Sequence, residues 1–263
     1  MIHRKNKRDI DFMRKSGRIL ARTLNLLKNA IKPGITTLEL DAIAEEHIRS
    51  KGGVPTFKGI YGDPTRGIPA FPASVCISVN EEVVHGIPGE RVLAEGDIIS
   101  LDCGVTLRKD GRTFVADSAL TLPVGKVSSE IEHLLKVTES ALYAGIAKAQ
   151  VGNRLFDISS AIEESIRPHG LGLVRDYEGH GVGYQLHEDP MVPNFGRAGT
   201  GPRIRSGWCL ALEPMVNLGE SGVKTLDDHW TVVTLDRSLS AHFEHTIAIT
   251  HEGTEILTRR DLP

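Results

Sequence analysis

Four acids and one histidine stand in segments of the chain that otherwise resemble buried strands. They are Asp102, Asp117, His180, Glu213 and Glu244, and His187 lies seven positions after the histidine. Carboxylates almost never enter a protein interior unpaired. Several carboxylates directed at one place repel each other unless cations lie among them. We therefore take these residues as the candidate chemistry of the chain.

The two aspartates of the first half are placed by strand alternation. Between them, Asp110-Gly111 is a strong two-residue hairpin turn. With that turn Asp102 lies opposite Ala119, and Asp117 is its diagonal neighbour. A turn one residue earlier would place the two aspartates directly opposite each other. In either register both carboxylates project from one face of the hairpin, where like charges need a neutralising partner. For these two residues alone, a solvated sheet face with unrelated acids is an equally good interpretation.

The second half adds three more polar residues in apolar surroundings. Glu213 ends an apolar run, and Pro214 stops the strand ladder there. Glu244 interrupts the segment 241–250, which is otherwise a good buried strand. His180 is flanked by glycines that let the backbone approach a ligand closely. These additions favour a common site over unrelated acids.

The charge of this set predicts a metal centre. Four carboxylates match the charge of two divalent cations, and an imidazole completes a hard, oxygen-rich ligand set. Such ligands suit Mn²⁺, Co²⁺, Fe²⁺ or Zn²⁺. Two metals that share carboxylates are typical of hydrolases.

Helical and strand periodicities predict the elements that hold these residues. Helices are expected over 9–30 and 36–48, the second opened by the capping box of Thr36 and Glu39. A second pair is expected at 128–148 and in a segment that ends near residue 166. The expected strands cover 74–79, 97–105, 112–122, 209–216, 231–235 and 244–250.

The pattern of elements repeats along the chain. A shift of 118 residues aligns Gly34 with Gly152 without gaps, and five further identities follow between the second helices of the two pairs. We expect one catalytic domain, 1–263, made of two duplicated helix-helix-sheet halves at about 9–125 and 126–258. Such an α+β fold would put the helices on one face of a joint sheet and leave the other face free for a site.

Bulk properties predict a cytoplasmic protein without a membrane segment. The 31 basic and 34 acidic side chains leave a net charge of −3. We therefore expect no overall positive potential that would attract nucleic acid. Cys76, Cys103 and Cys209 form no CxxC, which favours reduced thiols. The polar start and the absence of long apolar runs argue against a signal peptide and a membrane helix. The basic residues of 4–18 predict a solvated helix face, with docking on ribosomal RNA as the alternative.

Seven short motifs contain or neighbour the candidate residues. They are SVCISVNEEVVHGIP (74–88), SLDCG (100–104), DSA (117–119), GHGVG (179–183), HEDP (187–190), EPMV (213–216) and SAHFEHT (240–246). Together, and in this order, they resemble the type I methionine aminopeptidases of peptidase family M24. The resemblance implies the pita-bread fold, with two pseudo-symmetric halves around a dinuclear metal site. It also implies a monomeric enzyme that removes initiator methionine from nascent chains when the second residue is small.

The resemblance also implies roles for single residues. One metal would be held by Asp102, Asp117 and Glu244, and the other by Asp117, His180, Glu213 and Glu244. Glu213 would carry a proton from water to the leaving amine, and His187 and His85 would hold the reacting peptide by hydrogen bonds. The methionine pocket would be lined by Phe71, Cys76, Leu186 and Trp230.

Plainer interpretations exist for several of these residues. His85 could be a loop histidine paired with backbone, Phe71 and Trp230 could be core packing, and Cys76 could be a small buried hydrophobe. Strand alternation puts His242 and His245 on opposite faces, and we expect neither to be a ligand.

The chain departs from the family pattern in two places. The segment 58–71 is longer than usual, and an aromatic residue expected near Ile68 is missing. The hairpin between Asp102 and Asp117 is longer by about four residues, an even number that preserves the face each aspartate uses. Two other functions share the fold: a prolidase-like Xaa-Pro peptidase, and a non-enzymatic protein that binds nascent chains or RNA.

Overall fold

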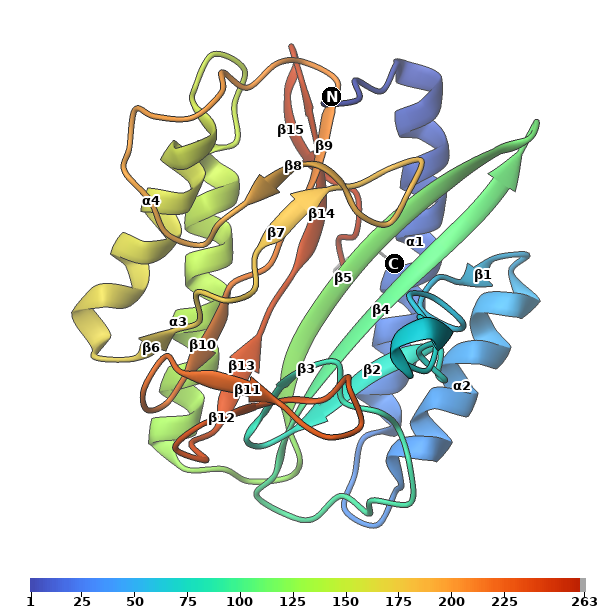
Figure 1. Ribbon diagram of the computed structural model, residues 1–263, viewed down its shortest axis with the longest axis vertical. Helices are drawn as coiled ribbons and strands as arrows, with labels where there is room; N and C mark the ends of the chain where they lie inside the picture. The colour runs from blue at the N-terminus through green and yellow to red at the C-terminus, as the bar shows by residue number, and fades with distance from the viewer. Residues whose placement is uncertain (261–263) are drawn as a thin grey trace.

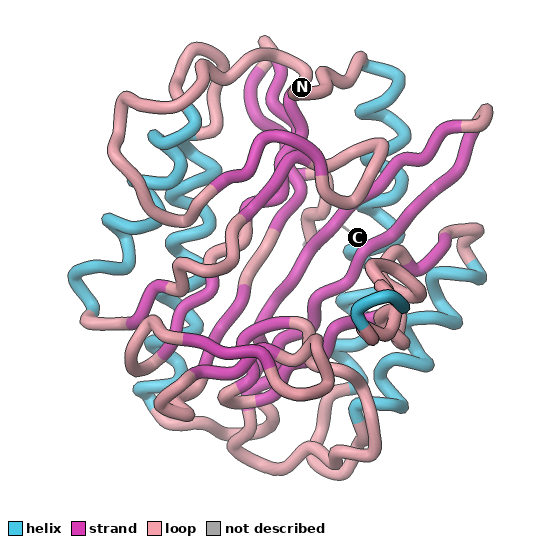
Figure 2. The backbone as a smooth tube through the Cα atoms, in the orientation of Figure 1, coloured by secondary structure: helices cyan, strands magenta, loops and turns pink. Residues whose placement is uncertain are grey.

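The computed structural model describes residues 1–260 as two helix pairs flanking a set of antiparallel sheets (Figure 1). The first pair is α1 (Lys7–Ala30) and α2 (Thr37–Ser50), and the second is α3 (Ser129–Lys148) and α4 (Leu155–Ile166). Figure 2 shows the strands filling the middle of the molecule between the pairs. Two short 3-10 helices, η1 (Pro64–Arg66) and η2 (Arg167–His169), complete the helical elements of the described chain.

The strands form four antiparallel sheets. Their bounds are β1 Val54–Pro55, β2 Val75–Val79, β3 Glu82–Val84, β4 Ile98–Lys109, β5 Arg112–Pro123, β6 Gly172–Leu173, β7 Gly179–Gly181, β8 Glu188–Val192, β9 Trp208–Leu212, β10 Met215–Asn217, β11 Val223–Thr225, β12 Val232–Thr234, β13 Ser240–His242, β14 His245–Thr250 and β15 Gly253–Ile256. In the first sheet β4 pairs β5 on one edge and β1 and β2 on the other. The largest sheet has the order β15-β14-β9-β7-β8, and two three-stranded sheets, β13-β10-β6 and β11-β12-β3, lie beside it.

Local capping explains where the first helices begin. Asn6 and Asp9 form a reciprocal capping box, so α1 starts at Lys7, two residues earlier than its apolar periodicity predicts. The predicted capping box of Thr36 and Glu39 is present at the start of α2. These caps satisfy backbone N–H groups that have no partner inside the helix.

The expected strand 209–216 is wrong in one respect, because it is two strands. β9 ends at Leu212 and β10 begins at Met215, and the break falls on Glu213 and Pro214. Proline has no N–H to donate to a ladder, so it ends β9 as the sequence predicts. The break leaves the Glu213 side chain free of the regular alternation of a strand.

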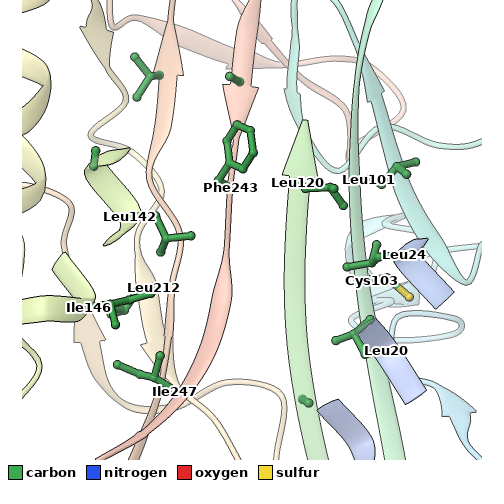
Figure 3. Packing of buried hydrophobic residues seen from close by; sticks show 14 of the residues in the cluster. Leu20, Leu24, Leu101, Cys103, Leu120, Leu142, Ile146, Leu212, Phe243 and Ile247 are labelled. Carbon is green, nitrogen blue, oxygen red and sulfur yellow. The ribbon is translucent and has the colours of Figure 1, made fainter. Parts of the chain in front are cut away.

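Apolar residues of alternate positions bind the helices to the sheets. Leu101, Cys103 and Val105 on β4 are fully buried and pack with Leu20 and Leu24 of α1 in one large core cluster. Figure 3 shows this packing for both halves, with Leu20, Leu24, Leu101 and Cys103 in one and Leu142, Ile146, Leu212 and Ile247 in the other. The helices therefore cover the apolar face of the strands, and Asp102 lies on the opposite face.

Side chains, rather than a regular ladder, join the two halves where β5 meets the chain around β14. Thr246 Oγ1 accepts a hydrogen bond from the Asp117 N–H at 2.9 Å and donates one to the Asp117 carbonyl at 2.8 Å. The Glu244 N–H donates to the Ala119 carbonyl at 2.8 Å, and Ser118 Oγ donates to the Glu244 carbonyl at 2.7 Å. We call this set of contacts the seam. It fixes the backbones of two candidate ligands against each other.

Several basic residues of 4–18 have partners within the protein. Lys5 forms an ion pair with Glu188, and both side chains are almost fully buried. Arg14 pairs with Asp11 and Glu255, at 2.5 and 2.6 Å. Thus part of the basic start is used to attach α1 to the second half. No helix within residues 1–260 is long and apolar enough to cross a membrane.

The Lys5–Glu188 pair anchors the loop that carries His187. Glu188 Oε1 also accepts hydrogen bonds from the backbone N–H groups of Tyr184 and Gln185, at 2.6 and 3.0 Å. A buried carboxylate that loses its cation keeps the desolvation cost of its charge.

We therefore expect Lys5→Met to lower the free energy of unfolding by about 3–5 kcal/mol, measured by urea denaturation. The double variant Lys5→Met/Glu188→Gln should recover much of that loss because no charge is left buried. Arg8→Met, which breaks the exposed Arg8–Asp110 pair, is the control and should have little effect. Equal losses for the single and double variants would contradict this account.

Candidate metal centre and substrate cleft

One cleft of about 270 Å³ brings the candidate residues of both halves together. All eleven residues proposed from the sequence as ligands, catalytic groups or pocket walls line it: Phe71, Cys76, His85, Asp102, Asp117, His180, Leu186, His187, Glu213, Trp230 and Glu244. A concave, mostly apolar cavity with a few converging polar groups is the usual form of a ligand site.

The hairpin register decides how the two aspartates face each other. Asp110 and Gly111 have φ of 51° and 73°, as the predicted two-residue turn requires. Asp102 lies opposite Ala119, and Asp117 lies opposite Gly104. The aspartates are therefore diagonal neighbours on one face, and the register with both directly opposite is excluded.

Candidate ligand atoms from β5, from β7 and from the link between β13 and β14 meet in the cleft. One oxygen of Asp117, one ring nitrogen of His180 and one oxygen of Glu244 all lie within 4.8 Å of one another, and all three residues are buried. His180 Nδ1 lies 2.9 Å from the Gly181 carbonyl, while its Nε2 lies 3.4 Å from Glu213 Oε1. Neutral imidazole with one nitrogen held by backbone is the common arrangement of a metal-ligating histidine.

Buried carboxylate oxygens without partners support a metal site on chemical grounds. Within residues 1–260, Asp102 Oδ1, Asp117 Oδ1 and Glu244 Oε1 are buried without a hydrogen-bond partner. Such atoms are costly unless something unseen satisfies them. Divalent cations coordinated by these oxygens would supply the missing partners and cancel the repulsion.

Electrostatics show how unfavourable the cluster is by itself. Burial raises the pKa of Asp102 to about 7, opposed by a hydrogen bond with Asp117. Burial, and then the charge of Asp102, raises the pKa of Asp117 well above its usual value. Burial and neighbouring carboxylates also raise the pKa of Glu213 and Glu244. Without cations the cluster therefore retains protons that free carboxyl groups lose.

The histidines respond to burial in the opposite direction. Burial, with a smaller effect of His187, lowers the pKa of His180 to about 3 and that of His85 to about 4. Burial also lowers the pKa of His187. These imidazoles are neutral near pH 7, which is the form that binds metals and accepts hydrogen bonds.

Aromatic side chains form the apolar wall of the cleft. Phe71 and Trp230 pack edge to face with ring centroids 5.2 Å apart, and His85 lies 6.2 Å from Trp230. Trp230 Nε1 donates to the Pro69 carbonyl at 2.9 Å. The indole thus links the segment 58–71 to the second half.

Some residues that line the cleft were not predicted from the sequence. They are Phe57, Ile60, Tyr61, Asp176, Tyr177, Glu178 and Met191. Tyr61 lies in the long segment 58–71, where an aromatic was missing near Ile68, and it is the only aromatic residue between Lys58 and Phe71. Its isolation in that segment was the available signal.

His242 and His245 have different neighbours, and they lie in separate strands, at the end of β13 and the start of β14. His242 is buried, and its Nε2 lies 3.8 Å from Glu213 Oε2. His245 Nδ1 lies 2.8 Å from Thr258 Oγ1, away from the cleft. His242 therefore neighbours the acidic cluster, and its distance from Glu213 depends on the break after β9.

The raised pKa of Asp102 predicts a pH-dependent stability. The metal-free folded state binds a proton at Asp102 up to about pH 7, whereas the unfolded state releases it near pH 4. The stabilisation that the folded state gains from this bound proton is therefore fully present below about pH 4 and is lost as the pH rises through 7.

Asp102→Asn should thus stabilise the chelated protein more at pH 8 than at pH 5, by about 2–3 kcal/mol. The measurement is urea unfolding at both pH values, with the exposed Asp227→Asn as control. An equal effect of Asp102→Asn at both pH values would rule out this titration.

Comparisons with known proteins agree with this geometry. The profile of metallopeptidase family M24 matches residues 11–251. The methionine aminopeptidase of Clostridium perfringens is 55% identical over 258 residues, which cover 98% of this chain and 99% of that protein. The crystal structure of methionine aminopeptidase from Thermotoga maritima has a TM-score of 0.92 and 41% identity, covering 98% of this chain and all of that one.

A more distant likeness concerns the fold alone. The prolidase from Pyrococcus furiosus has a TM-score of 0.74 at 19% identity and covers 98% of this chain and 66% of its own. The predicted pita-bread fold is confirmed, and the family and the buried ligand group together establish dependence on divalent metal. The chain belongs to metallopeptidase family M24 and, within it, to the methionine aminopeptidases.

Proposed function

We propose that this chain is an aminopeptidase that removes the initiator methionine from nascent proteins whose second residue is small. One observation carries the proposal: the acidic cluster and an apolar pocket share the same small cleft. An enzyme that cleaves after one amino-terminal residue needs its reactive centre next to a pocket for that residue's side chain. The name shared by the relatives supports the same activity.

We propose a dinuclear centre in which Asp117 and Glu244 serve both metal positions. Asp102 would complete one position, and His180 and Glu213 the other. When bound, two divalent cations (Co²⁺, Mn²⁺, Fe²⁺ or Zn²⁺) would supply a water of lowered pKa and polarise the scissile carbonyl. The carboxylates would remain ionised in that state because the cations offset their repulsion.

We assign Glu213 the role of proton carrier. It lies in the break between β9 and β10, and its side chain keeps 15% of its surface accessible, whereas His180 beside it keeps 4%. This access lets the carboxylate take a proton from water and deliver it to the leaving amine. Burial already favours the protonated form of Glu213.

Two neutral histidines would hold the reacting peptide. His187 lies beside the cluster, with its ring centroid 4.2 Å from that of His180. His85 lies farther along the cleft against Trp230 and Tyr177. Each can donate one N–H, so His187 would stabilise the carbonyl oxygen of the scissile bond and His85 the peptide.

The apolar pocket suits an unbranched thioether. Phe71 and Trp230 present aromatic surfaces, and the thiol of Cys76 and the side chain of Leu186 complete the wall. Methionine adapts to such surfaces, and its sulfur makes favourable contacts with aromatic rings. Burial raises the pKa of the Cys76 thiol, so this cysteine serves as an uncharged wall and not as a nucleophile.

We further propose a cytoplasmic monomer with one catalytic domain built from the two halves. The three buried free cysteines are compatible with a reducing compartment. The turns of the two halves are alike, since Gly34 and Gly152 have φ of 95° and 99°. Docking of the basic residues of 4–18 on ribosomal RNA stays an alternative. The internal ion pairs of Lys5 and Arg14 leave fewer of these charges to contact RNA.

We expect purified protein to release methionine from Met-Ala-X peptides only with divalent metal. Exhaustive chelation should abolish release, and adding Mn²⁺, Co²⁺, Fe²⁺ or Zn²⁺ one at a time should restore it to different extents. Asp117→Ala should reduce turnover below detection because it removes a ligand common to both positions. Turnover that survives both chelation and this substitution would contradict the proposal.

The alternatives are tested in the same assay. A prolidase-like enzyme would cleave Xaa-Pro peptides in preference to Met-Ala-X. A non-enzymatic binding protein would take up no metal under saturating conditions, as measured by elemental analysis of the dialysed protein.

A further inference from the structure

The long segment 58–71 is a built element, which we call the flap. Its two ends pair through backbone hydrogen bonds, from the Gly59 N–H to the Phe71 carbonyl at 2.8 Å and from the Phe71 N–H to the Ile60 carbonyl at 3.0 Å. Near its tip Asp63 and Ile68 exchange two backbone hydrogen bonds, at 2.8 and 3.0 Å. The flap is thus a folded-back, hairpin-like loop held by its own backbone hydrogen bonds.

Other contacts hold the flap at the cleft. The hydrogen bond from Trp230 to the Pro69 carbonyl ties it to the second half. A side chain at Gly62 would lie within 3.0 Å of the Ala70 backbone, so the two arms of the flap pack tightly there. Between these points Tyr61 adopts φ of 55°, a left-handed conformation that is uncommon for a residue other than glycine. The Tyr61 side chain lines the cleft.

Tyr61 contacts a catalytic histidine of the other half. Its Oη lies 2.6 Å from His187 Nδ1, and the two ring centroids are 5.5 Å apart with planes tilted by 32°. A phenol is protonated near pH 7, and burial raises the pKa of Tyr61 further, so the hydroxyl donates and Nδ1 accepts. A neutral imidazole that accepts at Nδ1 carries its hydrogen on Nε2.

We propose that Tyr61 is a positioning residue that fixes His187 in the Nε2–H form and aims that N–H at the scissile carbonyl oxygen. The inference rests on the proposed function, because it gives His187 a donor role in peptide cleavage. The hydroxyl acts through His187 and not on the substrate. The aromatic ring of Tyr61 forms part of the cleft wall as well, and the two contributions are separable by substitution.

Tyr61→Phe keeps the ring and removes only the hydroxyl. With Met-Ala-X peptides we expect kcat to fall about 3- to 10-fold, the loss of one hydrogen bond, while KM changes less than about twofold. Arg66→Ala, an exposed change in the same flap, is the matched control and should leave both constants unchanged. An unchanged kcat for Tyr61→Phe, or a rise in KM alone, would overturn the proposal and leave Tyr61 as pocket wall.

A second measurement does not depend on activity. Nitrogen-15 spectra of the metal-free protein report the tautomer of each histidine, and His187→Gln identifies the signals of His187. We expect the Nε2–H form in the native chain and in Arg66→Ala, and a mixture of tautomers in Tyr61→Phe. The same tautomer in all three proteins would overturn the proposal. If the native chain cleaved no peptide, the proposed function would fail, while these spectra would still decide whether Tyr61 sets the state of His187.

Discussion

The repulsion among four largely buried carboxylates is the constraint on which this structure depends. Asp102, Asp117, Glu213 and Glu244 come from both halves of the chain and end in one cleft. Burial raises the pKa of each, and the remaining charges raise it further for all but Asp102. A fold can hold such groups together only if its frame is stiff and if protons or cations offset the charge.

The frame is stiff because apolar packing and the seam act on opposite faces of the same strands. Leu101 and Cys103 bind β4 to the helices on one face, which directs Asp102 to the other. Across the middle of the molecule, Thr246 ties its own backbone segment to that of Asp117, and Ser118 does the same for Glu244. Hydrogen bonds between backbone and short side chains permit little adjustment, so the backbones of Asp117 and Glu244 are held in fixed positions relative to each other.

The elements governed by local rules could be predicted from the sequence. The capping box of Thr36 and Glu39 and the turn at Asp110-Gly111 depend on neighbouring residues only, and both are present. The register of the aspartates had two solutions until the turn conformation selected one. The short strands β6 to β8 escaped prediction because each contains glycine or proline, residues that are depleted in strands.

By itself the sequence determined the chemistry: acids and a histidine in apolar strands have few uses other than binding cations, and their motifs pointed to one family of peptidases. Only the tertiary structure decided which neighbours act on them. Tyr61 and His187 are 126 positions apart, and His242 approaches Glu213 through the break after β9. Such contacts depend on how two halves pack and on how a non-repetitive loop folds, and neither follows from spacing along the chain.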